Sequence, residues 1–209
     1  MGALTLPRGK TALLVIDLQN DFLHRDGKFA RGLPGRSLPE IAQEKNLIGT
    51  ASRVIAAARA AGVPIIHVKH AYRPDYADLP GNMRVFASML ELQAVQDRGW
   101  GADFVNEVKS APQDFVVTKT RVSSFYATPL EGILRALGTL CLVTLGIVTN
   151  GAVEGTVRDG ADRGYNMVLV EDGCIAATEE AHRAAVEGLL SLLATVVKAE
   201  DVVQVWTKG

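Results

Sequence analysis

The stretch LCLVTLGIVTNGAVEGTVRD, residues 140–159, decides the fold class. Residues 140–147 are an apolar run that predicts a buried strand, and a glycine-bearing turn leads from it into a helical pattern at residues 153–163. That helix should carry Val153, Val157 and Ala161 on one face. A strand that passes through a short turn into a helix is typical of the strand–helix–strand unit from which parallel sheets are built.

Further apolar runs without strict alternation are typical of strands covered on both faces. They span residues 11–16, 63–68, 114–117, 167–170 and 202–205. Helical patterns occupy residues 40–61, 128–137, 153–163 and 179–194, and Thr178 is the expected N-cap of the last. The alternation predicts an α/β fold: a three-layer, doubly wound, six-stranded parallel sheet, Rossmann-like, with helices on both faces.

The composition excludes several function classes. The chain has 209 residues, and we expect a single domain over residues 1–209. The net charge is −1 with dispersed Lys and Arg, so neither a nucleic-acid nor an anionic-membrane partner is expected. No apolar run approaches the roughly 20 residues of a membrane helix. We expect no secretory leader, because residues 1–10 lack an apolar segment. Two cysteines without a disulfide pattern favour reduced thiols and a cytoplasmic location.

Ligands of open α/β sheets bind outside the carboxyl ends of the strands, so the polar residues there are the candidates. Asp17 ends the run at residues 11–16, where partial burial would raise its pKa and suit it to proton transfer. The alternative is a loop or N-cap aspartate. Lys119 follows the run at residues 114–117 and would pair with Asp17 or stabilise negative charge, unless it is a solvated surface lysine.

The turn at residues 146–159 is the third candidate. It aims backbone N–H groups and the positive end of a helix at the same crevice, which favours a nucleophile with an oxyanion hole. Thr149 and Thr156 are the nucleophiles by residue type, but neither has a histidine base nearby in the sequence. The residues alone therefore predict an acid, a base and an anion-binding turn without a convincing nucleophile.

Three strings resemble the isochorismatase-like hydrolase family in order and spacing: VIDLQNDF, KTRVSSFYATPL and GIVTNGAVEGTVRDGADRGYNMVLVEDG. The resemblance runs from residue 11 to about residue 196 and is to the cysteine amidohydrolase branch, which includes N-carbamoylsarcosine amidase and ureidoacrylate amidohydrolase. It implies the same six-stranded parallel sheet, and it implies cleavage of a small amide or ureide substrate through a thioester.

The resemblance also assigns site residues. Asp17 takes the acid position, Lys119 the lysine position, and Ala152 stands where the family has its catalytic cysteine. The implied oxyanion hole is the backbone N–H of Val148 and of Ala152, and the family's cis peptide falls between Ile147 and Val148. A methyl group has no lone pair to donate, so Ala152 forms no acyl-enzyme.

Ala152 has three explanations. In the first, the chain is an engineered variant of an amidase in which alanine replaces the cysteine, so that the substrate stays intact in the pocket. Alternatively the alanine is natural, as in isochorismatases, which lack the cysteine and hydrolyse a vinyl ether with the aspartate as acid; the string K-x-R-x-S-x-F at residues 119–125 fits them, although T-N followed by V-E-x-T-x-R-D does not. Thirdly, the chain is a catalytically dead binding protein.

Four residues are substrate-binding candidates. Arg121 could donate two hydrogen bonds to a carboxylate or a carbonyl of the substrate, or it could form a structural salt bridge. Phe22 could line the pocket or pack in the core. Tyr72 and Trp100 lie in the irregular segment at residues 72–101, with Arg73 and Tyr76, which is either a lid or an ordinary surface loop. The segment EDG at residues 171–173 lacks the glutamine that some ureide-cleaving relatives have there.

No metal and no cofactor are expected. His67 and His70 lie three residues apart, but no D-x-H string accompanies them, unlike the metal-binding nicotinamidases of the family. The family resemblance implies a homodimer or homotetramer.

Overall fold

Six parallel strands form the centre of the molecule in the spatial order β3-β2-β1-β4-β5-β6. The computed structural model describes residues 4–33 and 35–208. Neighbouring strands are parallel throughout the sheet, which confirms the doubly wound α/β prediction. The strands are β1 Thr11–Ile16, β2 Ile65–His70, β3 Phe115–Lys119, β4 Cys141–Ile147, β5 Asn166–Ile175 and β6 Ala194–Val197.

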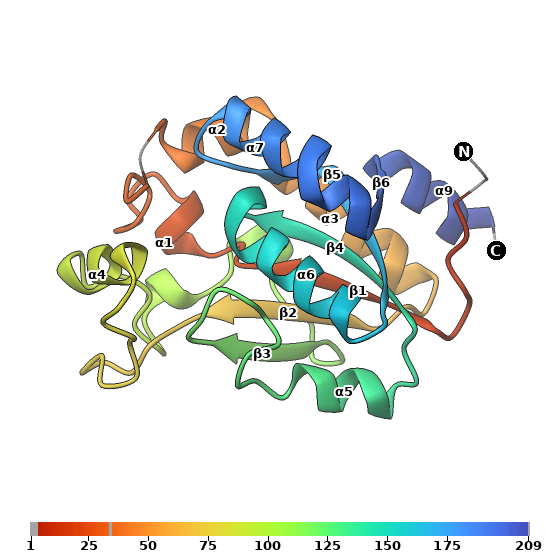
Figure 1. Ribbon diagram of the computed structural model, residues 1–209, viewed down its shortest axis with the longest axis horizontal. Coiled ribbons are helices and arrows are strands. Elements are labelled where there is room, and N and C mark those ends of the chain that lie inside the picture. Colours follow the sequence, from red (N-terminus) through yellow and green to blue (C-terminus); the bar gives the residue numbers. More distant parts are fainter. Residues whose placement is uncertain (1–3, 34, 209) are drawn as a thin grey trace.

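Helices cover both faces of the sheet (Figure 1). Helices α3 and α9 pack on one face, and α6 with the segment from α7 to α8 packs on the other. The α-helices are α1 Asn20–Leu23, α2 Leu38–Glu44, α3 Leu47–Ala60, α4 Arg84–Glu91, α5 Leu130–Ala136, α6 Glu154–Asp162, α7 Glu179–Ala185, α8 Ser191–Leu193 and α9 Ala199–Lys208. The short 3-10 and π turns are η1 Trp100–Ala102, η2 Asn106–Val108, η3 Thr149–Val153 and η4 Val186–Leu190.

β1 lies between β2 and β4, so the strand order reverses there, and the crevice of such a sheet opens at this point. Gly146 allows β4 to approach closely. Its φ is +133°, and an added Cβ would overlap the carbonyl oxygen of Ile16 on β1. The glycine therefore brings the end of β4 and the turn η3 beside the residue that follows β1.

The expected strand at residues 202–205 is wrong. These residues belong to α9, in which Ala199, Val202 and Trp206 are buried at helical spacing. The last strand is instead β6. Its first residue, Ala194, is the last residue of the helix predicted at residues 179–194. A four-residue valine-rich run does not distinguish a strand from a helix by periodicity. Here the carboxylate of Asp201, in the first turn of α9, accepts a hydrogen bond from the backbone N–H of Lys198 at 2.9 Å. This bond stabilises the start of the helix.

Two helix boundaries also differ from the prediction. The expected helix at residues 40–61 is divided into α2 and α3 at Asn46, whose left-handed backbone (φ 50°) breaks the helical path. The expected helix at residues 179–194 is divided into α7, η4 and α8 by the non-helical backbone of Gly188. Its predicted start is confirmed, because the Thr178 hydroxyl accepts a hydrogen bond from the N–H of Ala181 at 3.1 Å.

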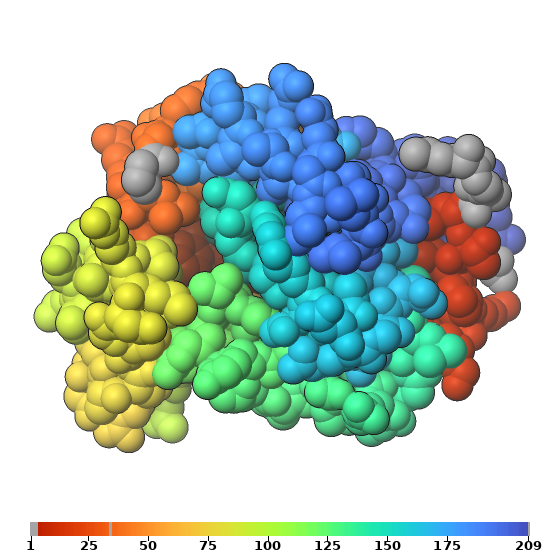
Figure 2. Space-filling view, viewed as in Figure 1, coloured from red at the N-terminus to blue at the C-terminus, as the bar shows by residue number. Residues whose placement is uncertain are grey.

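The molecular surface is hollowed between the yellow α4 segment and the cyan turn η3, with dark red atoms of the N-terminal region at its floor (Figure 2). Helix α4 arises within the irregular segment at residues 72–101, which is therefore partly helical. Within the described ranges, no helix has the length and apolar character needed to cross a membrane.

Candidate active site

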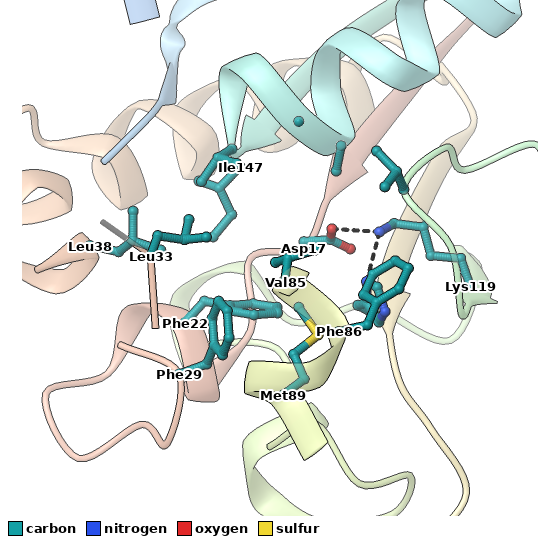
Figure 3. Close-up of a pocket in the computed structure, with 15 residues that line it drawn as sticks. Asp17, Phe22, Phe29, Leu33, Leu38, Val85, Phe86, Met89, Lys119 and Ile147 are labelled. Carbon is teal, nitrogen blue, oxygen red and sulfur yellow. Dashed lines mark hydrogen bonds and ion pairs between the residues drawn. The ribbon is translucent and has the colours of Figure 1, made fainter. Parts of the chain in front are cut away.

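The hollow contains a pocket at the carboxyl ends of the central strands (Figure 3). Its cavity has a volume of about 110 Å³. The predicted residues Asp17, Lys119, Val148, Ala152 and Phe22 all line it. The rest of the lining is Phe29, Leu33, Leu38, His70, Val85, Phe86, Met89, Val122, Ile147 and Gly151.

Asp17 is buried directly after β1, with a left-handed backbone of φ 56°, a conformation in which Asp is enriched among non-glycine residues. Its N–H donates to the carbonyl of Val68 at 2.9 Å, which ties the turn to β2. Burial raises the pKa of the Asp17 carboxyl, and the positive charge of Lys119 acts in the opposite direction. The carboxyl is thus placed for proton transfer.

Lys119 is the last residue of β3, and its side chain is almost fully buried. Its Nζ lies 2.8 Å from Oδ2 of Asp17. Because β2 lies between β1 and β3, this ion pair reaches across the end of β2. Oδ1 of Asp17 is buried and has no hydrogen-bond partner in the part of the chain that is described. One oxygen of this buried carboxylate is therefore left without a hydrogen bond from the described residues.

His70 occupies the end of β2 beneath this ion pair, and its role was not foreseen. Nδ1 of His70 lies 3.1 Å from Nζ of Lys119, and Nε2 lies 2.6 Å from the hydroxyl of Tyr72. Burial, and then the charge of Lys119, holds the pKa of His70 well below its ordinary value, so the ring is neutral. The spacing His67-x-x-His70 suggests a metal site, but the feature that predicts this contact is the position of His70 at the end of β2, the strand between β1 and β3.

Gln19 fixes the backbone of His70. Its Oε1 accepts the N–H of His70 at 2.7 Å, and its Nε2 donates to the carbonyls of His70 at 2.8 Å and of Ala102 at 2.9 Å. The Gln19 side chain is completely buried. Through these hydrogen bonds, Gln19 joins β2 to the loop after β1. Removing a buried side-chain amide that is satisfied in this way would leave its partners without hydrogen bonds.

The turn η3 follows β4 at the opposite side of the pocket. The Ile147–Val148 peptide bond is cis, and Val148, Gly151 and Ala152 face the cavity. Helix α6 begins at Glu154, so the turn lies at the amino-terminal end of a helix. Ala152 and the Asp17–Lys119 pair therefore share one pocket, as the sequence predicts.

Three substrate-binding candidates lie outside the pocket lining. Tyr72 is completely buried behind His70, and Trp100 is 52% exposed, with its ring edge-on to His24 at 5.0 Å. The guanidinium of Arg121 donates to the carbonyls of Asp78 at 3.2 Å and Thr120 at 2.9 Å. Arg121 thus contacts backbone carbonyls rather than a carboxylate. The exposure of Trp100 and the backbone bonds of Arg121 depend on loop geometry that local sequence does not specify.

No cluster of three or more His, Cys, Asp or Glu side chains suited to a metal ion occurs in the described ranges. His67 lies 3.3 Å from the carboxylate of Asp114, and burial lowers its pKa while Asp114 acts in the opposite direction. His67 and His70 therefore contact different partners.

The fold and the pocket define a three-layer α/β protein with a buried carboxyl–ammonium pair at the crevice of its sheet. A model of the isochorismatase domain matches residues 11–201. The chain belongs to this family.

Relatives of known function and a solved structure are similar over most of the chain. It is 30% identical to the ureidoacrylate amidohydrolase of Acinetobacter baylyi over an alignment 214 residues long, gaps included. The alignment covers 96% of this chain and 85% of that protein. It is 34% identical to that of Pseudomonas savastanoi pv. phaseolicola over 181 residues, 81% of this chain and 72% of that protein. The crystal structure of N-carbamoylsarcosine amidase from Thermoplasma acidophilum matches with a TM-score of 0.71 and 26% identity, covering 91% of this chain and 97% of that one.

Proposed function

We propose that this chain carries the site of an amidohydrolase that acts on a small amide or ureide. Asp17 is the proton-transfer group, Lys119 is its charged partner, and residue 152 occupies the nucleophile position. The backbone N–H groups of Val148 and Ala152 form the oxyanion hole. The observation that carries the proposal is the 2.8 Å Asp17–Lys119 ion pair, buried in the pocket that Ala152 lines. The ureidoacrylate amidohydrolases similar to this chain add support.

With cysteine at position 152, the reaction would proceed in balanced steps. Asp17 takes the thiol proton, and the thiolate attacks the carbonyl carbon to give an oxyanion held by the two backbone N–H groups. The C–N bond breaks, and the amine or ammonia leaves with the proton from Asp17. Water then adds to the thioester as Asp17 takes its proton, and the thiol leaves with that proton as the acid product forms.

With Ala152, the reaction does not proceed beyond substrate binding. The methyl group supplies no electron pair, while the carboxyl, the ammonium and the backbone donors are independent of the residue-152 side chain. We infer that the chain binds substrate at this site and does not form the thioester.

The test is the substitution Ala152→Cys. We expect the variant to release ammonia or amine from members of a panel of small neutral and charged amides and ureides, and to accumulate an acyl-enzyme visible by intact-protein mass spectrometry. The unsubstituted chain and the double variant Ala152→Cys with Asp17→Asn are the controls, and both should be inactive. An Ala152→Cys variant that folds, reacts with a thiol reagent and yet hydrolyses no panel member would contradict the proposal.

A second candidate is vinyl-ether hydrolysis by Asp17 as a general acid. It is favoured by the burial that raises the pKa of Asp17, because a general acid needs its protonated form. This reaction needs no nucleophile at residue 152. Turnover of isochorismate by the unsubstituted chain would establish it and displace the amidohydrolase proposal. Ligand binding without turnover by either protein would indicate a binding protein.

We also infer the cellular compartment and the oligomeric state of the protein. Cys141 and Cys174 are both free and buried, which favours a reducing compartment such as the cytoplasm. Burial raises the pKa of Cys174 to about 12, so this thiol is not a substitute nucleophile. We expect a homodimer or homotetramer, which light scattering of the purified protein would establish.

A further inference from the structure

We propose that the ligand of this pocket is an amide whose acyl part is an uncharged, apolar group of about the size of a ring, and not a carboxylate-bearing ureido acid. This inference rests on the proposed function, because it names the substrate class of the same site. It is carried by the chemistry of the cavity walls and by the hydrogen bonds of the single ammonium group that faces it.

The walls beside Asp17 are apolar. Phe22, Phe29 and Leu38 contribute from the α1–α2 region, while Phe86 and Met89 contribute from α4 on the other side (Figure 3). The rings of Phe22 and Phe29 meet edge to face, with centroids 5.6 Å apart. Such a wall favours contact with a flat or branched apolar group, because apolar surface is transferred out of water there.

The ionisable side chains among the described lining residues are Asp17, His70 and Lys119. A lysine ammonium has three N–H donors. Those of Lys119 are directed to Oδ2 of Asp17 at 2.8 Å, Nδ1 of His70 at 3.1 Å and the carbonyl of Arg121 at 3.2 Å. Its charge is neutralised by Asp17, and its donors are already committed. A ligand carboxylate would therefore enter without a free cation to receive it.

Arg121 does not change this conclusion. Its guanidinium contacts the carbonyls of Asp78 and Thr120 outside the pocket lining. Placing an unpaired carboxylate against apolar side chains is strongly unfavourable, and an additional negative charge beside Asp17 makes it more so. The pocket therefore favours uncharged ligands over carboxylates, whatever the shape of the ligand.

The size of the cavity fits one ring. Its volume of about 110 Å³ is of the same order as the roughly 150 Å³ of an apolar cavity that holds benzene. The amide carbon would lie toward Ala152 and the oxyanion donors, and the free Oδ1 of Asp17 would accept the amide N–H. Ureidoacrylate, the compound in the names of the relatives, is by contrast a carboxylate at neutral pH.

The test compares benzamide with benzoate, which share a ring and differ in charge at pH 7.5. With the unsubstituted chain, we expect calorimetry to give a dissociation constant at least about tenfold lower for benzamide than for benzoate. Ureidoacrylate should bind as weakly as benzoate. Equal or tighter binding of either carboxylate would overturn the inference, and so would a failure of both benzamide and phenylacetamide to bind.

A matched pair of variants on α4 provides the second arm. Val85 lines the pocket, whereas Leu90 lies on the same helix, is 47% exposed and does not line it. We expect Val85→Lys to reverse the preference by supplying an unpaired cation, and Leu90→Lys to leave the ratio of the two dissociation constants unchanged. A Val85→Lys variant that is folded by circular dichroism and still rejects benzoate would contradict the charge argument.

The two proposals fail separately. If the Ala152→Cys variant hydrolyses ureido acids with a higher kcat/KM than neutral amides, the substrate class is wrong while the amidohydrolase function stands. If that variant hydrolyses nothing but the unsubstituted chain prefers benzamide to benzoate, the function is wrong while the apolar, uncharged ligand class stands.

Discussion

Nδ1 of His70 lies 3.1 Å from Nζ of Lys119 and completes the hydrogen bonding of that ammonium group. An ammonium only donates, so Nδ1 is the acceptor and the ring proton is on Nε2. Nε2–H then donates to the hydroxyl of Tyr72, 2.6 Å away. This chain of contacts keeps His70 neutral and Lys119 directed at Asp17.

Stability should fall in mild acid because His70 cannot take up a proton in the folded state. Burial lowers its pKa well below the ordinary value of about 6.5, which applies to the unfolded chain. Below that pH the unfolded chain binds one proton more, so the free energy of unfolding decreases by up to about 1.4 kcal/mol per pH unit for this group. Above pH 6.5 the contribution is complete. Urea unfolding at pH 7.5, 6.5 and 5.5 measures the slope.

The variant His70→Asn separates this effect from that of other groups. It removes the side chain that does not take up a proton in the folded state, so its slope should be smaller than that of the unsubstituted chain. Equal slopes for the two proteins would show that His70 does not carry the pH dependence.

The Asp17–Lys119 pair should behave as a unit. Asp17→Asn leaves a buried ammonium without its counter-charge, and we expect a loss of about 3–5 kcal/mol in the free energy of unfolding. Adding Lys119→Met to that variant should recover part of the loss, since two neutral side chains remain. Chemical denaturation of both single variants and the double variant measures the coupling. Simple additivity would mean that the pair does not interact in solution.

Gly146 should tolerate no side chain. Gly146→Ala places a Cβ against the carbonyl oxygen of Ile16 at a φ of +133°, and we expect destabilisation by about 3 kcal/mol. Gly132→Ala, on α5 with open space around it, is the matched control and should stabilise by about 0.5–1 kcal/mol. Thermal unfolding compares the two variants. A neutral Gly146→Ala would show that β4 can move away from β1.

The cap of α7 is a smaller test. Thr178→Ala removes the acceptor for the N–H of Ala181 and should cost about 1 kcal/mol. Ser37 precedes α2 without a side-chain cap bond, so Ser37→Ala should change the free energy of unfolding by less than about 0.5 kcal/mol. A Ser37→Ala loss as large as that of Thr178→Ala would refute the capping interpretation.

Much of the architecture was predictable because the central strands β1, β2 and β4 are mostly buried apolar runs, and β1 is followed directly by the polar Asp17. Thr11–Ile16 and Cys141–Ile147 lie where the sequence placed them, and Asp17 and Lys119 meet because parallel strands end at one edge. The chain end was not predictable by the same rule. Val202 is buried on α9, which packs against α3, and periodicity over four residues does not reveal this tertiary packing.

The pocket walls were harder to foresee than its charged residues. Phe29 and Met89 come from segments far apart in the sequence, and no local pattern connects them before the chain folds. The sequence spacing pairs His70 with His67, whereas the folded chain brings His70 against Lys119 on the neighbouring strand. A single sequence gives residue types and strand ends, whereas pairing between loops and across strands comes only with the packed structure.

The committed donors of Lys119 and the apolar walls have a thermodynamic consequence. Because most of the pocket wall is apolar, binding of a neutral amide should carry a negative heat-capacity change, with an enthalpy that becomes more favourable on warming. Its affinity should also vary little with ionic strength, since no free ionic contact forms. Calorimetric titrations over a range of temperatures and salt concentrations would measure both the heat-capacity change and the salt dependence of the affinity.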